Sequence, residues 1–252
     1  MMRYYALALV TAAVMAQPTV APPAIGTVRD ASGSLHAVIG VAGNFIVNDT
    51  GITNAVSAAF SASAGLVKTD TQVVVLDNTG QITNQFDAAP GPALFAFDRA
   101  GAPALAYYAG SLYRFDRNQL VPVNWNGDAV SIARSGPSSA SVLVRRDDGL
   151  WSVRVNALSG DVENETRLAD VAGPVILLAS GDLLFTRDNN LVVRDTSGAE
   201  RFIPPPFDVD SFDAMGKDWI AVRESGGGRL CALHITPLTL EMYQIPDPEV
   251  TR

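Results

Sequence analysis

One hairpin pattern recurs six times along the chain, and this repeat constrains the fold more than any other feature. Each copy is an apolar strand that ends in a polar residue, followed by a tight polar turn and a second strand. The two most similar copies are residues 45–49 with 52–54 and residues 73–77 with 81–84, because both share Thr-Gly and Ile-Thr-Asn. A repeat of this kind indicates an array of equivalent supersecondary units.

The spacing of the copies is nearly constant. Their first strands end at residues 49, 77, 116, 154, 195 and 234, so the successive gaps are 28, 39, 38, 41 and 39 residues. A second correspondence supports this frame, because Asp30-Ala31-Ser32-Gly33 precedes Ala42-Gly43 much as Asp98-Arg99-Ala100-Gly101 precedes Ala109-Gly110. The short first gap indicates either a trimmed second unit or a ring closed by five units.

Each unit has room for four strands. The clearest set is residues 93–97, 104–108, 112–116 and 120–123, with glycine at the turns, where a tight hairpin needs a positive φ. Runs such as 73–76 are apolar on both faces, which is typical of a sheet covered on both sides by other sheets. No long stretch has apolar residues at helical spacing, so the sequence predicts an all-β fold.

Four-stranded sheets of about 40 residues that repeat and cover one another resemble the β-propeller superfamily, over residues 25–245. The resemblance implies six four-stranded blades. The Gly-His and Trp-Asp marks of WD40 repeats and the Gly-Gly doublet of kelch repeats do not recur, and Asp148-Gly149-Leu150-Trp151 resembles one unit of a quinoprotein-like blade. The alternative fold is a pair of two-sheet β-sandwiches, which would not predict a steady period.

The first residues have the pattern of an export signal. Met1-Met2-Arg3 supplies a positive start, residues 4–13 are apolar, and Val14-Met15-Ala16 is a small-x-Ala cleavage pattern. The apolar run is shorter than the roughly 20 residues that span a bilayer, so no stable membrane insertion is expected after cleavage. We therefore predict a signal peptide at 1–16, a linker at 17–24, a propeller domain at 25–246, a tail at 247–252, and a secreted or periplasmic location.

Composition excludes two classes of protein. Hydrophobic residues make up 48% of the 252 residues and charged residues 17%, which is incompatible with a disordered chain. The net charge is −8, or −9 after cleavage at Ala16, and the only lysines are Lys68 and Lys217. Without a basic stripe for phosphates, nucleic acid is not an expected partner.

The residues that most often carry chemistry are few. The only histidines are His36 and His234, and Cys231 is the only cysteine. Cys231 and His234 stand three apart on a predicted strand and so point to opposite faces, which makes Cys231 a predicted buried structural thiol. His36 is expected to be a hydrogen-bonded residue of a sheet. No serine-hydrolase elbow, zinc-protease motif or phosphate-binding loop is present.

The resemblance to propellers implies that a ligand binds where the links between blades and the loops between second and third strands meet. In this frame the ligand-binding residues are expected to be Trp125, Asn126, Asp128, Asp148, Asp188, Asn190, Phe207, Asp208 and Glu224. Oxygen ligands from several loops could hold Ca²⁺, which is the one cofactor left open. Asp and Asn also suit turns and keep a secreted protein soluble, and this interpretation is favoured, so no metal ligand is assigned.

Three functional hypotheses remain. The leading one is a binding or scaffold module for a protein, a glycan or a small molecule, because no catalytic motif is present. The alternative is a Ca²⁺-dependent hydrolase or lactonase-like propeller, in which acidic loop residues hold the ion. A third is carbohydrate binding through Trp125, Trp151 and Phe207. Whether the protein is an enzyme stays open at this point, and the sequence favours a non-catalytic role.

Overall fold

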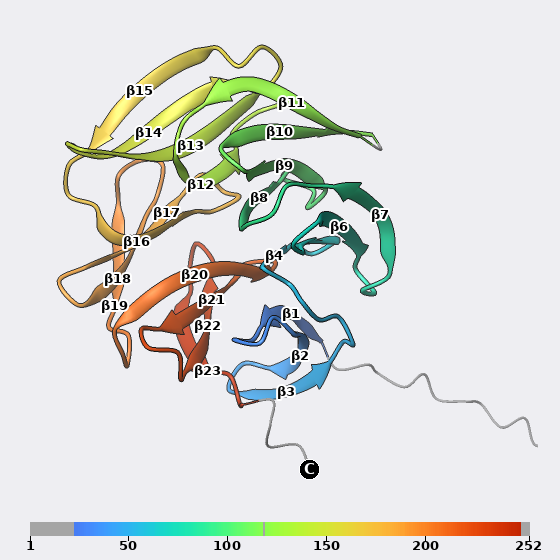
Figure 1. The fold of residues 1–252 in the computed structure, drawn as a ribbon. Helices are drawn as coiled ribbons and strands as arrows, with labels where there is room; N and C mark the ends of the chain where they lie inside the picture. The colour runs from blue at the N-terminus through green and yellow to red at the C-terminus, as the bar shows by residue number, and fades with distance from the viewer. Residues whose placement is uncertain (1–22, 118, 248–252) are drawn as a thin grey trace, which may run out of the picture.

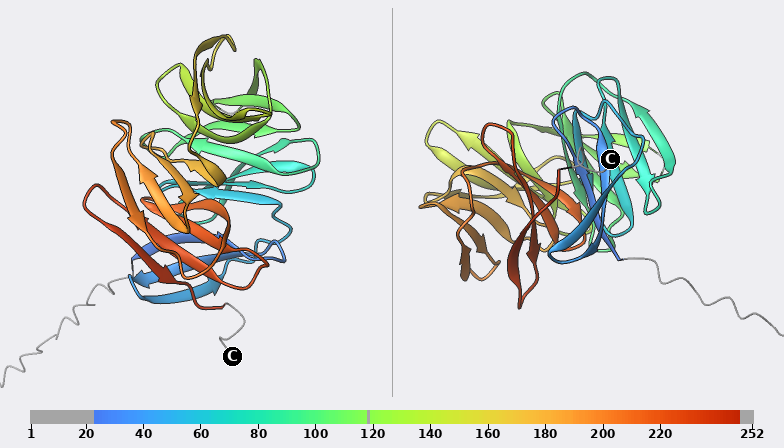
Figure 2. Two further views of the ribbon diagram at one scale, coloured as in Figure 1. Left: turned by 90° about the vertical axis from the view of Figure 1, so that its left-hand side faces the viewer. Right: turned by 90° about the horizontal axis from the view of Figure 1, so that it is seen from below.

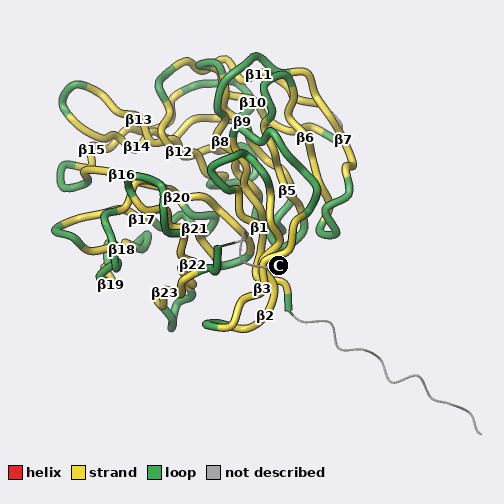
Figure 3. The backbone as a smooth tube through the Cα atoms, turned by 60° about the horizontal axis from the view of Figure 1, so that its bottom comes forward, coloured by secondary structure: helices red, strands yellow, loops and turns green. Residues whose placement is uncertain are grey.

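The protein is built of strands and loops (Figure 3). The computed structural model describes residues 23–117 and 119–247, and within these ranges it contains 23 strands and no helix. The predicted signal peptide, most of the linker and the end of the tail lie outside the described residues. In the described part of the chain, no helix has the length and apolar character needed to cross a membrane.

The strands follow one another as antiparallel meanders, each made of neighbours in the sequence. The first comprises β1 (Ala24–Arg29), β2 (Leu35–Val41) and β3 (Asn44–Asp49). The second comprises β4 (Ser57–Phe60), β5 (Ala64–Lys68), β6 (Gln72–Asp77) and β7 (Ile82–Asp87). The third comprises β8 (Ala93–Phe97), β9 (Pro103–Tyr108), β10 (Ser111–Asp116) and β11 (Gln119–Asn126). The fourth comprises β12 (Ala129–Arg134), β13 (Ser139–Arg146), β14 (Gly149–Asn156) and β15 (Val162–Leu168). The fifth comprises β16 (Ala172–Leu177), β17 (Leu183–Arg187), β18 (Asn190–Arg194) and β19 (Glu200–Ile203). The sixth comprises β20 (Val209–Gly216), β21 (Trp219–Glu224), β22 (Leu230–Ile235) and β23 (Leu240–Gln244).

The meanders are arranged radially, so the chain is a β-propeller (Figure 1, Figure 2). The predicted six four-stranded blades are wrong, however. The first meander has three strands, and a parallel bridge between Phe60 of β4 and Met215 of β20 joins the second and sixth meanders into one eight-stranded sheet. The described strands thus form five hydrogen-bonded sheets. Three have four strands and one has eight, and these four are the complete blades; the fifth sheet is the three-stranded first meander.

The three-stranded meander explains why the first gap of the repeat is short. A four-stranded meander returns the chain to the end at which it began, so β4, β8, β12, β16 and β20 run in one direction. A three-stranded meander does not, so β1 runs the opposite way. Gly26 accordingly lies against Met215, near the end of β20, whereas the carbonyl of Arg29 accepts a hydrogen bond from Arg223, which pairs with Ser211 near the start of β20.

By direction, β2 of the first meander therefore corresponds to the third strand of the others, and β3 to the fourth. The repeat in the sequence aligned residues 45–49, which form β3, with the third strands of the later meanders, although by direction β3 is a fourth strand. Counted from the end of β2 at Val41, the distance to Asp77 is 36 residues, close to the other spacings. The second meander is complete, so the expectation of a trimmed second unit is wrong.

A repeated turn fixes several hairpins. In the turns that start at Asp30, Asp77, Asp98 and Asp195, the carboxylate accepts the backbone N–H groups two and four residues later, and a glycine at the fourth position has a left-handed φ. Asp30 also bonds to His36, with 3.0 Å between Oδ2 and Nε2. Burial alone would raise the pKa of Asp30, but the hydrogen bonds from His36, Ser32 and Ser34 outweigh it and lower the pKa to about 2.

This low pKa predicts how stability depends on pH. A carboxyl whose folded pKa is depressed stabilises the protein fully above its ordinary pKa of 3.8, and this contribution is lost as the pH falls towards 2. We expect Asp30→Asn to lower the free energy of unfolding by about 1 kcal/mol at pH 6, allowing for solvent screening, and the difference from wild type to shrink between pH 4 and pH 2. Urea unfolding across this range measures it, and a difference that stays constant with pH would contradict the assignment.

Candidate functional site

The nine predicted ligand-binding residues lie at one end of the sheets. Trp125 and Asn126 end β11, Asp128 follows in the link to β12, and Phe207 and Asp208 lie in the link before β20. The other four are at turns between second and third strands, at Asp148, Asp188, Asn190 and Glu224. The alternating direction of the strands places all these segments at the end where β8, β12, β16 and β20 begin.

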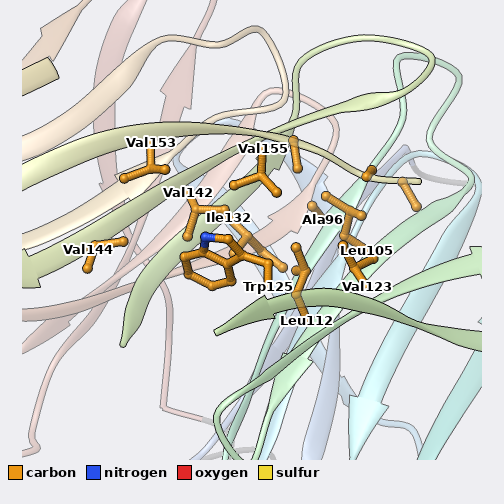
Figure 4. Packing of buried hydrophobic residues seen from close by; sticks show 13 residues of the cluster. Ala96, Leu105, Leu112, Val123, Trp125, Ile132, Val142, Val144, Val153 and Val155 are labelled. Atoms are coloured by element: carbon orange, nitrogen blue, oxygen red, sulfur yellow. The ribbon is translucent and has the colours of Figure 1, made fainter. Parts of the chain in front are cut away.

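Two of the nine belong to the core. Trp125 is buried in a cluster with Leu112, Val142 and Val155, and its ring meets that of Tyr107 edge-on at 6.3 Å (Figure 4). Phe207 is buried between the fifth and sixth meanders, where the guanidinium of Arg229 covers its ring at 5.1 Å. Trp125 is therefore a packing residue, whereas Phe207 also lines a small cavity of about 280 Å³ together with Arg229 and Met242.

Several of the polar members already have protein partners. Asp148 accepts a hydrogen bond from the indole N–H of Trp151 at 2.9 Å, and the Trp151 ring lies under the guanidinium of Arg146. Glu224 pairs with Arg229, which lowers the pKa of the Glu224 carboxyl. The remaining residues, Asn126, Asp128, Asp188 and Asp208, are exposed, and Asn190 is half-buried and donates to the carbonyl of Asp188. In the described part of the chain, no three His, Cys, Asp or Glu side chains are placed to hold a metal ion.

A cavity of about 1000 Å³ occupies the centre of the propeller. Most of its wall comes from the five strands that run in one direction, β4, β8, β12, β16 and β20, and no described residue of β1 lines it. The bridge between Phe60 and Met215 closes the wall beside the first meander. None of the nine predicted residues lines this central cavity.

The wall is mainly apolar. Its half-buried apolar side chains include Phe95, Ile176 and Phe212. Two wall serines bind neighbouring strands, since Ser57 accepts the backbone N–H of Ala93 at 3.1 Å and Ser131 accepts that of Leu177 at 2.8 Å. These bonds fix the spacing of the inner strands around the central cavity.

One end of the central cavity has a polar rim. The rim is formed by turns after the inner strands, by two turns that join third and fourth strands, and by one residue of β19, Arg201. Its members are Ser61, Asp98, Arg99, Ser180, Asp182, Asp195, Arg201, Lys217, Asp218 and Thr236. These turns lie at the opposite end of the sheets from the predicted face. Ser61 holds two of them together by donating to the carbonyl of Gly101 at 2.6 Å.

The sequence did not predict the rim, because turns such as those at Asp98 and Asp195 belong to the repeated hairpin pattern and were expected to be structural. Asp98-Arg99-Ala100-Gly101 is one of the four repeated Asp turns, and nothing in its sequence separates it from Asp30-Ala31-Ser32-Gly33, which lies away from the cavity. The signal that could have found it is position. The turns after β4, β8, β16 and β20 line the cavity, whereas the Asp30 turn follows β1, which runs in the opposite direction.

The other reactive residues are structural. Cys231 is buried in the core between the fifth and sixth meanders, as predicted, and burial raises the pKa of its thiol. His234 stacks on Trp219 with 4.3 Å between ring centres. His36 lies in β2 and is hydrogen-bonded, which confirms the expectation for this residue. None of the three lines the central cavity.

Comparison with known proteins finds similar solved structures at low sequence identity. No protein-family model matches it, and no curated protein matches it. A streptogramin B lyase structure is similar at 13% identity, covering 90% of this chain and 84% of its own, with a TM-score of 0.47. Virginiamycin B lyase from Staphylococcus aureus is similar at 12% identity, covering 91% of this chain and 86% of its own, with a TM-score of 0.44. The WD40 domain of Neurospora crassa Pan2 is similar at 8% identity, covering 90% of this chain and 80% of its own, with a TM-score of 0.47.

Proposed function

We propose that the protein is a binding module that takes its ligand into the central cavity through the polar rim. The observation that carries this proposal is the cavity itself, about 1000 Å³ with an apolar wall and a few charged groups at one end. Ligand sites are concave, mostly apolar and supplied with a small number of polar groups that orient the ligand. The predicted face at the other end offers exposed acids and two buried rings instead.

The sequence supports the wider setting of this proposal. A secreted or periplasmic location remains a prediction, since it depends on residues outside the described ranges. The acidic net charge of −8 disfavours nucleic acid and leaves a small molecule, a glycan or a protein segment as the ligand. Apolar walls favour a ligand with an apolar body.

The alternative hypothesis of a Ca²⁺-dependent hydrolase can be tested by thermal melting. We expect the melting temperature of the mature protein to be the same in EDTA and in excess Ca²⁺, because no observation in the described residues favours a metal site. A ligand that binds only the folded state must raise its stability, so a higher melting temperature in Ca²⁺ would favour that alternative over ours.

The proposed function is tested with the dye anilinonaphthalene sulfonate (ANS), whose apolar rings and single charge suit an apolar cavity with a rim that includes Arg99, Arg201 and Lys217. We expect one ANS molecule to bind per folded protein. Ala100→Trp, at the rim, should weaken binding at least about tenfold by filling the entrance, whereas Ala102→Trp, in the same turn but outside the lining, should not. Both alanines are exposed, so both variants should fold.

Fluorescence titration at constant protein concentration gives the stoichiometry and the Kd. Two results would contradict the proposal: the absence of saturable ANS binding, or equal weakening by Ala100→Trp and Ala102→Trp. Melting curves of the two variants check that each is as stable as wild type.

A further inference from the structure

We infer that the central cavity binds an extended, uncharged peptide segment, which pairs with the edge of an inner strand. This inference rests on the proposed function and names the class of ligand. It is carried by three features of the wall: its cross-section, its unpaired strand edges and its lack of free charge.

The cross-section suits one extended chain. The inner strands are about five residues long, which is about 16 Å at 3.3 Å per residue. A volume of about 1000 Å³ over this length gives a mean cross-section of about 60 Å². A strand packed within a protein occupies roughly 4.8 Å by 10 Å, or about 48 Å².

The wall also offers the hydrogen bonds that an extended chain requires. β8, β12 and β16 each stand at the end of their sheet, with a partner strand on one side and the cavity and a neighbouring inner strand on the other. One N–H on this second side is already bound in β8, that of Ala93 to Ser57, and one in β16, that of Leu177 to Ser131, so the pairing uses the other edge groups. An edge strand presents a row of backbone N–H and C=O groups that are ready to pair with another chain. Peptides that add a strand to such an edge gain affinity from the main chain and selectivity from alternate side chains.

The charges favour a neutral segment. Among the described inner-strand residues that line the cavity, Asp213 is the only charged one. Its carboxylate is paired with Arg223, with 3.0 Å between Oδ2 and Nε, and the same guanidinium bonds to the carbonyl of Arg29. A charged side chain deep in the cavity would therefore lose its hydration without gaining a free partner. Charges on the ligand belong at the rim, where both signs are present.

The experiment compares two compounds of the same shape against ANS. The first is the neutral hexapeptide acetyl-Ser-Val-Ala-Ser-Val-Ala-amide. The second is its depsipeptide, in which ester oxygens replace the backbone N–H groups and so remove the donors. We expect the peptide to displace ANS with an apparent Kd at least about tenfold lower than the depsipeptide, because each lost hydrogen bond weakens pairing. The peptide should lose this affinity in Ala100→Trp and keep it in Ala102→Trp.

Failure of this inference is distinct from failure of the proposed function. If ANS binds saturably but the peptide and the depsipeptide displace it equally, or neither displaces it, the cavity is a ligand site but strand pairing is wrong. If ANS itself does not bind, the proposed function fails and the inference with it.

A second measurement uses the wild-type protein alone. Hydrogen exchange should slow in β8, β12 or β16 when the hexapeptide is added, because its carbonyl groups accept the free edge N–H groups of one of these strands. ANS should not produce this protection. Unchanged exchange in all three strands at saturating peptide would overturn the inference.

Discussion

Replacing Gly26 with alanine should destabilise the folded protein by about 3 kcal/mol. A Cβ atom at this position would lie 1.8 Å from the carbonyl oxygen of Met215 and 2.5 Å from its carbonyl carbon. Both atoms belong to the backbone, so no side chain can move aside. The contact is reciprocal, since a Cβ at Gly216 would lie 2.3 Å from the carbonyl oxygen of Ile25. The two glycines allow β1 to approach β20 where the three-stranded meander meets the sixth.

Gly136→Ala is the matched control. Neither Gly26 nor Gly136 has a left-handed φ, and a Cβ at Gly136 would find its nearest atom at 3.8 Å, an ordinary contact. The control should therefore leave the stability within about 0.5 kcal/mol of wild type or raise it slightly. Urea unfolding of both variants measures the difference. Equal stability of the two variants would mean that β1 does not lie against β20, and the account of the first meander would fail.

Trp125→Ala should cost about 3 to 5 kcal/mol, which is typical of a large aromatic side chain removed from a core. The indole is buried among the valine and leucine side chains of the third and fourth meanders, and Gly127 leaves it room, since a Cβ there would lie 2.8 Å from the ring. The variant distinguishes the packing role seen in Figure 4 from the ligand-binding role expected from the sequence.

The control for this variant is Trp151→Ala. Trp151 is half-buried, bonds to Asp148 and lies under Arg146, so its loss should cost about 1 kcal/mol. Thermal or urea unfolding compares the two. If Trp125→Ala were no more destabilising than Trp151→Ala, the burial of Trp125 would be in doubt and its role at the surface would reopen.

Local features of this chain could be predicted from sequence because they depend on neighbours. Apolar runs such as 73–76 became strands, and the Asp turns at Asp77 and Asp195 form as glycine and carboxylate chemistry requires. The number of strands in the first meander could not be predicted in the same way. Asp49-Thr50-Gly51 looks like the turn after Asp77, yet it ends the last strand of its meander, and only the direction of β1 relative to β20 reveals this.

The candidate site was harder to predict because it joins distant segments. Trp125 lies at the end of β11 and Phe207 in the link before β20. They are buried because Gly127 leaves room for the ring of Trp125 and Arg229 covers that of Phe207. The central cavity arises where five strands from five meanders meet, and its rim uses common turn residues such as Asp98 and Asp218. No local pattern marks such a meeting point.

Photolabelling tests the central claim most directly. A photoreactive azide derivative of ANS, bound to the wild-type protein and irradiated, should form adducts that map by mass spectrometry to fragments containing β8, β12, β16 or β20, and unlabelled ANS should suppress them. Adducts confined to the loops that carry Asp128, Asp148, Asp188 and Asp208 would contradict the account and place the binding site on the opposite face.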